Sequence, residues 1–243
     1  MEFRGASAYD QPEFFSNYMK RRNRIDSPNN AIETPIIYEL ISDIKEKHIL
    51  DLGCGDASFG KGLLELGAKH YTGVEGSEQM VEAAHINILG ENATILYETM
   101  ESYKYQENSF DIVTSRFAIH YVSDINLLFQ SIHNTLKANG RFVFSIQHPL
   151  TTSSFASKDS GEKRGSWIVD DYFLNGERKE PWINEIVVKY HHTIEQYFTA
   201  LRKAGFTILD LREGTPNRDH CNSEEEFTRR QRIPVVLAFS CTK

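Results

Sequence analysis

Apolar and polar positions follow two different periods along the chain, and residues 48–75 show both in succession. Residues 48–52 form a short apolar run of the length of a buried strand. The Gly-Cys-Gly-Asp turn at 53–56 lets a ligand approach the backbone closely, because glycine has no side chain. Apolar residues then recur at helical spacing up to Gly67, and a further apolar run ends at Glu75. The pattern predicts a strand, a glycine turn, a helix and a second strand that ends in a carboxylate.

Such a βαβ unit is typical of nucleotide-binding domains. The free N–H groups at the start of its helix bind polar or anionic ligands, and the carboxylate can accept both hydroxyls of a ribose. The spacing differs from the Gly-x-Gly-x-x-Gly of dinucleotide-binding proteins, because the third glycine, Gly60, is displaced by two positions. Asp51, at the end of the first strand, would repel a pyrophosphate. It is better suited to a cationic ligand.

The remaining pattern alternates strands and helices, which predicts an α/β protein. The periodicity predicts strands at 94–97, 110–115, 141–146, 206–212 and 234–240, and helices at 12–21, 29–42, 77–90, 124–137 and 193–205. Residues 167–173 and 182–190 alternate like the two strands of a hairpin, with Asn175-Gly176 as the turn. We interpret 213–232 as a long polar loop.

Composition narrows the class of protein. A chain of 243 residues fits one domain, and its formal net charge of −7 gives no overall attraction for nucleic acid. The basic run at 20–24 is interpreted as a solvated helix end, with a phosphate-binding patch as the alternative. Three cysteines without paired spacing do not form a disulfide framework, and no apolar run approaches the length of a membrane span. These features, with no signal-peptide pattern at the N-terminus, predict a soluble cytoplasmic protein.

The residues that carry the cofactor chemistry point to one family. The run Asp51-Leu52-Gly53-Cys54-Gly55, together with Glu75, resembles motif I and the ribose-binding acid of the class I S-adenosylmethionine-dependent methyltransferases. The segment 136–145 resembles the motif around the fifth strand of that family, with Ala138-Asn139 in place of its usual Pro-Gly. The resemblance covers residues 30–148 by motif and 192–241 by architecture.

The resemblance implies a fold and a domain plan. The family has a Rossmann-like, doubly wound, seven-stranded mixed sheet with an antiparallel last strand. The whole chain, 1–243, would be a single methyltransferase domain, in which 1–28 form an N-terminal lid over the cofactor and substrate. An ordinary packed N-terminal helix is the alternative for that segment. Residues 150–190 would form an inserted hairpin or cap after the fifth strand, over the active-site edge.

The resemblance also implies which residues bind the cofactor. Asp51 and the turn Gly53-Cys54-Gly55 would hold its amino-acid part, and Glu75 its ribose. Thr99 and Met100 would bind the adenine, where the family often has an aspartate instead. The remaining candidates for cofactor binding are Gly76, Met80, Ser115, Tyr18 and Arg24, of which Ser115 would contact the cofactor near its sulfonium and Arg24 its carboxylate.

Candidate residues for the acceptor lie after the strands that end at this edge. His120 and His148 are candidates for a general base, and hydrogen-bonded wall residues are the alternative. Tyr9, Tyr121, Trp167 and Tyr172 are candidates for substrate binding, as is Trp182, unless the aromatics of the insert only anchor it to the core. His191 and His192 are adjacent and point to opposite faces, so we expect no metal.

The predicted function is methyl transfer from S-adenosylmethionine to a small-molecule acceptor with an N, O, S or C nucleophile. Three alternatives remain open: a non-catalytic S-adenosylmethionine-binding regulatory or partner protein, a tRNA or other nucleic-acid methyltransferase, and a dehydrogenase with an atypical glycine turn. Nucleic acid is disfavoured because 115–118 read Ser-Arg-Phe-Ala, not the Asn/Asp-Pro-Pro-Tyr of enzymes that methylate base amino groups. The pattern predicts no membrane partner and does not indicate an oligomeric state.

Overall fold

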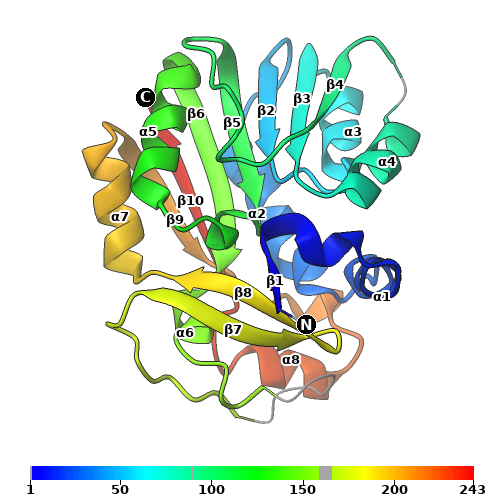
Figure 1. Cartoon of the computed structure of the whole chain (residues 1–243), viewed down its shortest axis with the longest axis vertical. Helices are drawn as coiled ribbons and strands as arrows, with labels where there is room; N and C mark the ends of the chain where they lie inside the picture. Colours follow the sequence, from blue (N-terminus) through cyan, green and yellow to red (C-terminus); the bar gives the residue numbers. More distant parts are fainter. Residues whose placement is uncertain (1, 89, 159–165) are drawn as a thin grey trace.

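The computed structural model describes residues 2–88, 90–158 and 166–243 (Figure 1). A seven-stranded sheet with the order β4-β3-β2-β5-β6-β10-β9 forms its centre. The strands are β2 (His48–Leu52), β3 (His70–Glu75), β4 (Ala93–Tyr97), β5 (Phe110–Arg116), β6 (Leu136–Gln147), β9 (Thr207–Glu213) and β10 (Val236–Thr242). Strand β10 runs antiparallel to both of its neighbours, β6 and β9, whereas the other pairs of neighbouring strands are parallel. The predicted doubly wound, seven-stranded mixed sheet with an antiparallel last strand is confirmed.

Helices cover both faces of this sheet, so its strands are apolar on both sides. One core contains α5 (Ile125–Thr135) and α7 (Ile194–Lys203), which pack on Leu50, Leu52 and other residues of that face. The second contains α2 (Thr34–Ile41), α3 (Ser58–Glu65) and α4 (Glu78–Asn87), on the face that includes Ile49. Alternate residues of β2 therefore serve opposite cores, as the period of a strand requires.

The helices begin where the sequence predicts caps. Ser77 accepts the Met80 N–H at 3.2 Å, and Asp124 accepts the N–H groups of two residues in the first turn of α5. Thr193 and Gln196 form a capping box at the start of α7. Ahead of α2 lies one π-helical turn, Asn29–Glu33, so the predicted helix 29–42 is present but not uniform.

A second, three-stranded sheet joins the two segments that flank the central fold. Strand β1 (Glu2–Arg4) pairs in parallel with β8 (Glu185–His191), which pairs antiparallel with β7 (Gly176–Trp182). A 3-10 turn (Gly5–Asp10) and α1 (Pro12–Arg22) follow β1, and the short α6 (Pro149–Thr152) follows β6. The predicted lid and the predicted cap thus share one sheet, beyond the carboxyl ends of β2 and β5 (Figure 1).

The predicted hairpin is present, but its first strand and its turn were wrong. The chain turns at Ile183 and Asn184, not at Asn175-Gly176, and both residues have positive φ (51° and 64°). A two-residue hairpin turn requires that conformation. The first strand is β7, which is polar and contains Pro181. Proline is tolerated there because β7 is an edge strand.

The predicted polar loop 213–232 is also wrong, because it contains α8 (Glu224–Arg230) and a short 3-10 turn (Arg218–His220). Ser223 caps α8 by accepting the Glu226 N–H at 3.1 Å. The carboxylates at the start of α8 are favoured by the helix dipole. Arg230 donates to the backbone oxygen of Asp26 and so attaches α8 to the N-terminal segment.

Candidate active site

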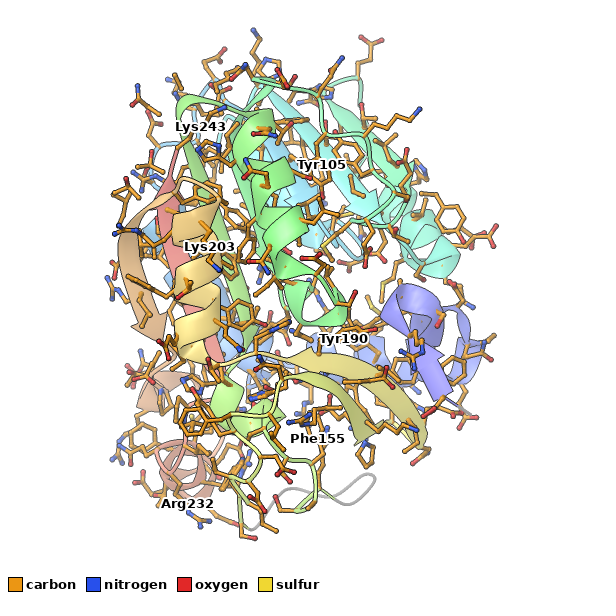
Figure 2. All side chains as sticks on the ribbon, turned by 60° about the vertical axis from the view of Figure 1, so that its left-hand side comes forward. Tyr105, Phe155, Tyr190, Lys203, Arg232 and Lys243 are labelled. Carbon is orange, nitrogen blue, oxygen red and sulfur yellow. The ribbon has the colours of Figure 1, made fainter. Side chains whose placement is uncertain are left out.

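A cavity of about 950 Å³ lies between the carboxyl ends of the parallel strands and the three-stranded sheet β1-β8-β7. The carboxyl edge of an open α/β sheet is where such proteins bind ligands, and the volume is at the upper end for a small-molecule site. Two residues that line it, Tyr190 and Phe155, lie on and beside the β7–β8 hairpin in Figure 2. Residues far apart in the sequence therefore form a single chamber.

The glycine turn after β2 forms one wall of this cavity. Gly53 and Gly55 have φ of 72° and 58°, and a methyl group added at Gly53 would overlap the Cβ of Ala118. The N–H groups of Gly53 and Cys54 both donate to the Val74 oxygen, at 2.8 and 3.1 Å. Around Gly55 an added Cβ would meet nothing within 4 Å, so a ligand has room next to the backbone there. The geometry explains why both positions are glycine.

Glu75, the last residue of β3, lies next to this turn and is only 7 % exposed. Its carboxylate accepts the Gly55 N–H at 2.8 Å and the Ser77 N–H at 3.0 Å. Burial raises the pKa of Glu75 to about 7, against the opposing effect of these N–H groups. Because a carboxylate has about four acceptor positions, Glu75 can still accept two hydroxyls from a ribose.

Most of the predicted cofactor residues lie together in the cavity. Its lining includes Tyr18, Arg24, Gly53, Gly55, Glu75, Gly76, Met80, Thr99 and Met100. Asp51, Cys54 and Ser115 do not line it. The turn and the ends of three strands are thus brought together as the sequence suggested, and a direct contact of each residue with a cofactor stays a prediction.

Asp51 lies beneath the glycine turn instead of on the cavity wall. Its two oxygens accept hydrogen bonds from the Tyr71 hydroxyl at 2.7 Å and from Thr114 at 2.8 Å. Burial raises the pKa of Asp51, and these two bonds act against that effect. The carboxylate therefore joins β2 to β3 and β5.

Ser115 and Cys54 have similar internal positions. Ser115 donates to the Leu52 oxygen at 2.8 Å and so connects β5 to β2. The Cys54 thiol lies in the apolar core between the sheet and α3, and burial raises its pKa well above the usual value. Both residues hold the turn in place from behind.

His120 is the histidine that lines the cavity, and it is 2 % exposed. Burial lowers its pKa well below the usual value, and the positive charge of Lys189 lowers it further. The Gln147 N–H points at its Nδ1 at 3.5 Å, so the neutral ring carries its proton on Nε2. In this tautomer His120 presents a hydrogen-bond donor at Nε2.

The structure does not bring His148 to the cavity. The Leu150 N–H donates to its Nδ1 at 3.2 Å, and its Nε2 donates to Glu213 at 3.0 Å. Burial lowers the pKa of His148, while Glu213 acts in the opposite direction. Both ring nitrogens are used in holding α6 and β9 together, which leaves none for a substrate.

Aromatic side chains from the lid and the hairpin form the wall opposite the glycine turn. Tyr9 and Tyr121 share a hydrogen bond of 3.1 Å between their hydroxyls. Tyr9, Tyr18 and Phe14 meet Trp182 edge to face, with ring centroids 5.4–6.2 Å apart. The lid therefore depends on the hairpin for its packing.

The two remaining candidates of the insert lie in different places. Trp167 lines the cavity, with the Arg232 guanidinium 5.2 Å from its ring centroid. Tyr172 does not line it: its ring packs on His191, and its backbone oxygen accepts a hydrogen bond from the His191 ring at 2.9 Å. For Tyr172 the alternative role, anchoring the insert, fits the geometry.

A buried ionic cluster in the cavity wall was not found from the sequence. Glu180 on β7 pairs with both Lys189 on β8 and Lys158. Burial alone would raise the pKa of Glu180, but the two ammonium groups outweigh it and lower that pKa to about 2. The Lys189 Nζ lies 4.6 Å from the centroid of the Trp182 ring. The signal in the sequence was a lysine directly after two buried valines.

A second group that was missed attaches the lid to the cofactor side. Asp10 accepts the Ser77 hydroxyl at 2.7 Å and the Gln79 N–H at 3.3 Å. The Gln79 side chain donates back to the Asp10 oxygen at 2.8 Å. These bonds hold the lid at the first turn of α4, immediately after Glu75.

The comparisons with known proteins agree with this geometry. Residues 50–144 match the family model described as a methyltransferase domain. A solved S-adenosylmethionine-dependent methyltransferase from Mesorhizobium loti superposes with a TM-score of 0.81 at 29 % identity, over 88 % of this chain and 99 % of that one. The chain belongs to the class I S-adenosylmethionine-dependent methyltransferases. The predicted family and the prediction of an enzyme are confirmed.

Two curated relatives of this methyltransferase add to the picture. An uncharacterised protein of Haemophilus influenzae is 31 % identical over 217 residues, which cover 85 % of each chain. A ubiquinone biosynthesis O-methyltransferase of Neisseria meningitidis is 30 % identical over 108 residues, 43 % of this chain and 45 % of that one. The second match covers less than half of each chain.

The described residues also bear on metal binding and on membrane insertion. In residues 2–88, 90–158 and 166–243, no three His, Cys, Asp or Glu side chains are grouped as metal ligands would be. Over the same ranges, none of the helices has the length and apolar character to cross a bilayer. The expected absence of a metal stays a prediction.

Proposed function

We propose that this methyltransferase transfers the methyl group of S-adenosylmethionine to a small-molecule acceptor. The observation that carries the proposal is the single cavity of about 950 Å³, which has the glycine turn and Glu75 on one side and the aromatic wall on the other. Its residues fit the cofactor, because the turn leaves room beside Gly55 and Glu75 offers acceptors to a ribose. The lid and the hairpin cover this space, which favours a small acceptor over a nucleic acid.

The residues of the cavity would act mainly by positioning the cofactor and the acceptor relative to each other. The bound cofactor supplies a methyl group on a cationic sulfur, which the nucleophilic atom of the acceptor displaces in line. Tyr9, Tyr121 and Trp182 would orient the acceptor against that methyl group and keep water away. Asp10 would hold the lid closed over the pair.

The protonation of His120 bears on whether a general base takes part. A neutral ring with its proton on Nε2 suits a hydrogen-bond donor that orients the acceptor. We therefore propose that the acceptor arrives as a nucleophile, or that His120 takes up a proton only after a change of tautomer. In either case the main contribution of the protein is alignment.

Three further observations support a small molecule in the cytoplasm. The Neisseria relative, which matches 43 % of this chain, is named a ubiquinone biosynthesis O-methyltransferase. The net charge of −7 gives no attraction for nucleic acid. The three cysteines are free thiols, as expected for a reducing compartment. We include a cytoplasmic location in the proposal.

Calorimetry combined with turnover tests this function. We expect S-adenosylmethionine and S-adenosylhomocysteine to bind, NAD not to bind, and Glu75→Ala to weaken binding by about 1.5–3 kcal/mol, because a charged hydrogen-bond acceptor is lost. Glu78→Ala, which removes a carboxylate close by in the sequence but outside the cavity lining, is the matched control. Formation of S-adenosylhomocysteine with a panel of small acceptors, and not with tRNA, would support the proposal.

Other outcomes would contradict it. Binding of cofactor without turnover on any acceptor would favour a regulatory or partner protein. Turnover on RNA alone would favour a nucleic-acid methyltransferase, and preference for NAD would contradict the cofactor assignment itself.

A further inference from the structure

Charged residues in the cavity lining are separated by sign. The acidic ones lie almost all at the ends of β3 and β4: Glu75, Glu98 and Glu101, with Asp10 held against the first turn of α4. The basic ones come almost all from other segments, namely the lid, the insert and α8: Arg4, Arg21, Arg22, Arg24, Lys158, Lys189 and Arg229. We call this second group the basic wall.

Most cations of the basic wall are held in place by carboxylates that lie outside the cavity lining. Arg22 pairs with Asp56 at 3.6 Å, and Arg24 pairs with Asp26 at 3.4 Å. Arg229 pairs with Glu226 at 2.7 Å. The cation of each pair lines the cavity, while its partner does not. Such an arrangement presents positive charge to a ligand even in a protein whose net charge is −7.

Three cations that line the cavity have another environment. Arg116, on β5, also lines the cavity, but its Nε and Nη2 both donate to the buried carboxylate of Glu33, so it belongs to the sheet edge. Lys189 and Lys158 share Glu180, which does line the cavity. Lys189 is 1 % exposed and lies against the rings of Trp182 and Tyr121. Within a closed cavity, charges like these interact more strongly than in water.

We propose that the methyl acceptor carries an anionic group, a carboxylate or a phosphate, that binds to the basic wall while its nucleophile faces the cofactor. This inference rests on the proposed function and names the substrate class for the same cavity. The carboxylates at the ends of β3 and β4 suit the cationic cofactor, and the cations of the lid, the insert and α8 suit an acceptor of opposite charge. Planar guanidinium groups bind carboxylates and phosphates with two hydrogen bonds each.

The two tryptophans of the chain provide the assay. Both Trp167 and Trp182 line the cavity, so intrinsic fluorescence reports its occupancy without a label. The protein would first be saturated with S-adenosylhomocysteine, so that the carboxylate of the cofactor is already bound. Benzoate, phenyl phosphate and benzamide are then titrated in parallel. The first two distinguish carboxylate from phosphate, and the amide is a neutral control for benzoate.

We expect saturable fluorescence changes with at least one of the two anions and none with benzamide at the same concentrations. Arg21→Gln and Lys189→Met should each weaken binding of the anion by about tenfold or more, as expected for loss of a charged hydrogen-bond donor. Lys20→Gln and Lys179→Met should bind like the wild type, because neither lysine lines the cavity. The Arg21 side chain is exposed, so its variant tests the proposal even if Lys189→Met does not fold.

Two results would overturn the inference. One is equal behaviour of benzoate, phenyl phosphate and benzamide, including binding of none. The other is unchanged affinity for the anions in Arg21→Gln and, where that variant folds, in Lys189→Met. Binding of S-adenosylhomocysteine itself is measured separately by calorimetry, so its absence would count against the proposed function and not against the basic wall.

Discussion

Glu75 should release a proton when the methyltransferase binds S-adenosylhomocysteine. In the structure, burial raises the pKa of this carboxyl group to about 7, compared with 4.5 for the free side chain. The difference corresponds to about 3 kcal/mol favouring the protonated form. Two ribose hydroxyls donate best to the ionised carboxylate, so binding should return its pKa towards the usual range. The ligand therefore binds only to protein in which Glu75 is ionised.

The sign and size of the effect follow from this shift. Below pH 7 the free protein is mainly protonated at Glu75 and must lose that proton to bind, so affinity falls as the pH falls. Binding should release about 0.9 proton at pH 6, about 0.5 at pH 7 and almost none at pH 8.5, with about tenfold weaker affinity at pH 6 than at pH 8.5. Titration calorimetry in buffers of different ionisation enthalpy counts these protons.

The control for this experiment is Glu75→Gln, which keeps the shape of the side chain and cannot ionise. Its proton count contains the contributions of the ligand and of all other groups, so the difference between the two proteins belongs to Glu75. Equal proton counts in wild type and variant at pH 6, or equal affinity of the wild type at pH 6 and pH 8.5, would refute this reasoning.

Three further predictions concern the turn, the histidines and the ionic cluster. Gly53→Ala should destabilise the protein by about 1–3 kcal/mol in denaturant unfolding, because its methyl group would overlap Ala118 at a positive φ; unchanged stability would contradict this. His148→Gln should leave KM for the cofactor and the acceptor unchanged and lower stability, whereas His120→Gln should change turnover; the opposite pattern would assign the active-site role to His148. The ionised Glu180 should stabilise the fold by about 3 kcal/mol above pH 4.5, and this contribution should be lost as the pH falls towards 2. Glu180→Gln should lack that acid-dependent part of the unfolding curve, and identical pH profiles would count against it.

The central sheet could be predicted because its signals are local and repeated. Buried strands such as β2 and β5 contain short apolar stretches, and each of α4, α5 and α7 begins at a side chain that caps its own first turn. The doubly wound, mixed sheet with an antiparallel last strand was implied by the family resemblance. Residue type and spacing were sufficient for these parts.

The placement of single side chains depends on geometry that spacing does not contain. Leu50 and Leu52 face the core of α5 and α7, so the pleat of β2 turns Asp51 to the opposite face, under the turn. His148 follows β6 directly, but its ring caps α6 by accepting the Leu150 N–H. The sequence pattern predicted the correct edge of the sheet for both residues. That neither of them lines the cavity is shown only by the structure.

The lid and the hairpin were the hardest parts to predict because they depend on contacts between distant segments. Strand β7 is polar in sequence, and it is held by a buried carboxylate that two lysines share. At the other edge of this sheet, β1 pairs in parallel with β8, which lies more than 180 residues further along the chain. Neither contact can be predicted from a local pattern in the sequence. Both became visible only with the fold.

A crystal structure of the protein with S-adenosylhomocysteine tests the central claim most directly. We predict the ligand in the cavity, with both ribose hydroxyls within hydrogen-bond distance of the Glu75 carboxylate and the sulfur directed towards His120 and Tyr121. The space between the sulfur and the basic wall should then be large enough for an acceptor. A ligand bound elsewhere, or a ribose that does not contact Glu75, would contradict the account of this site.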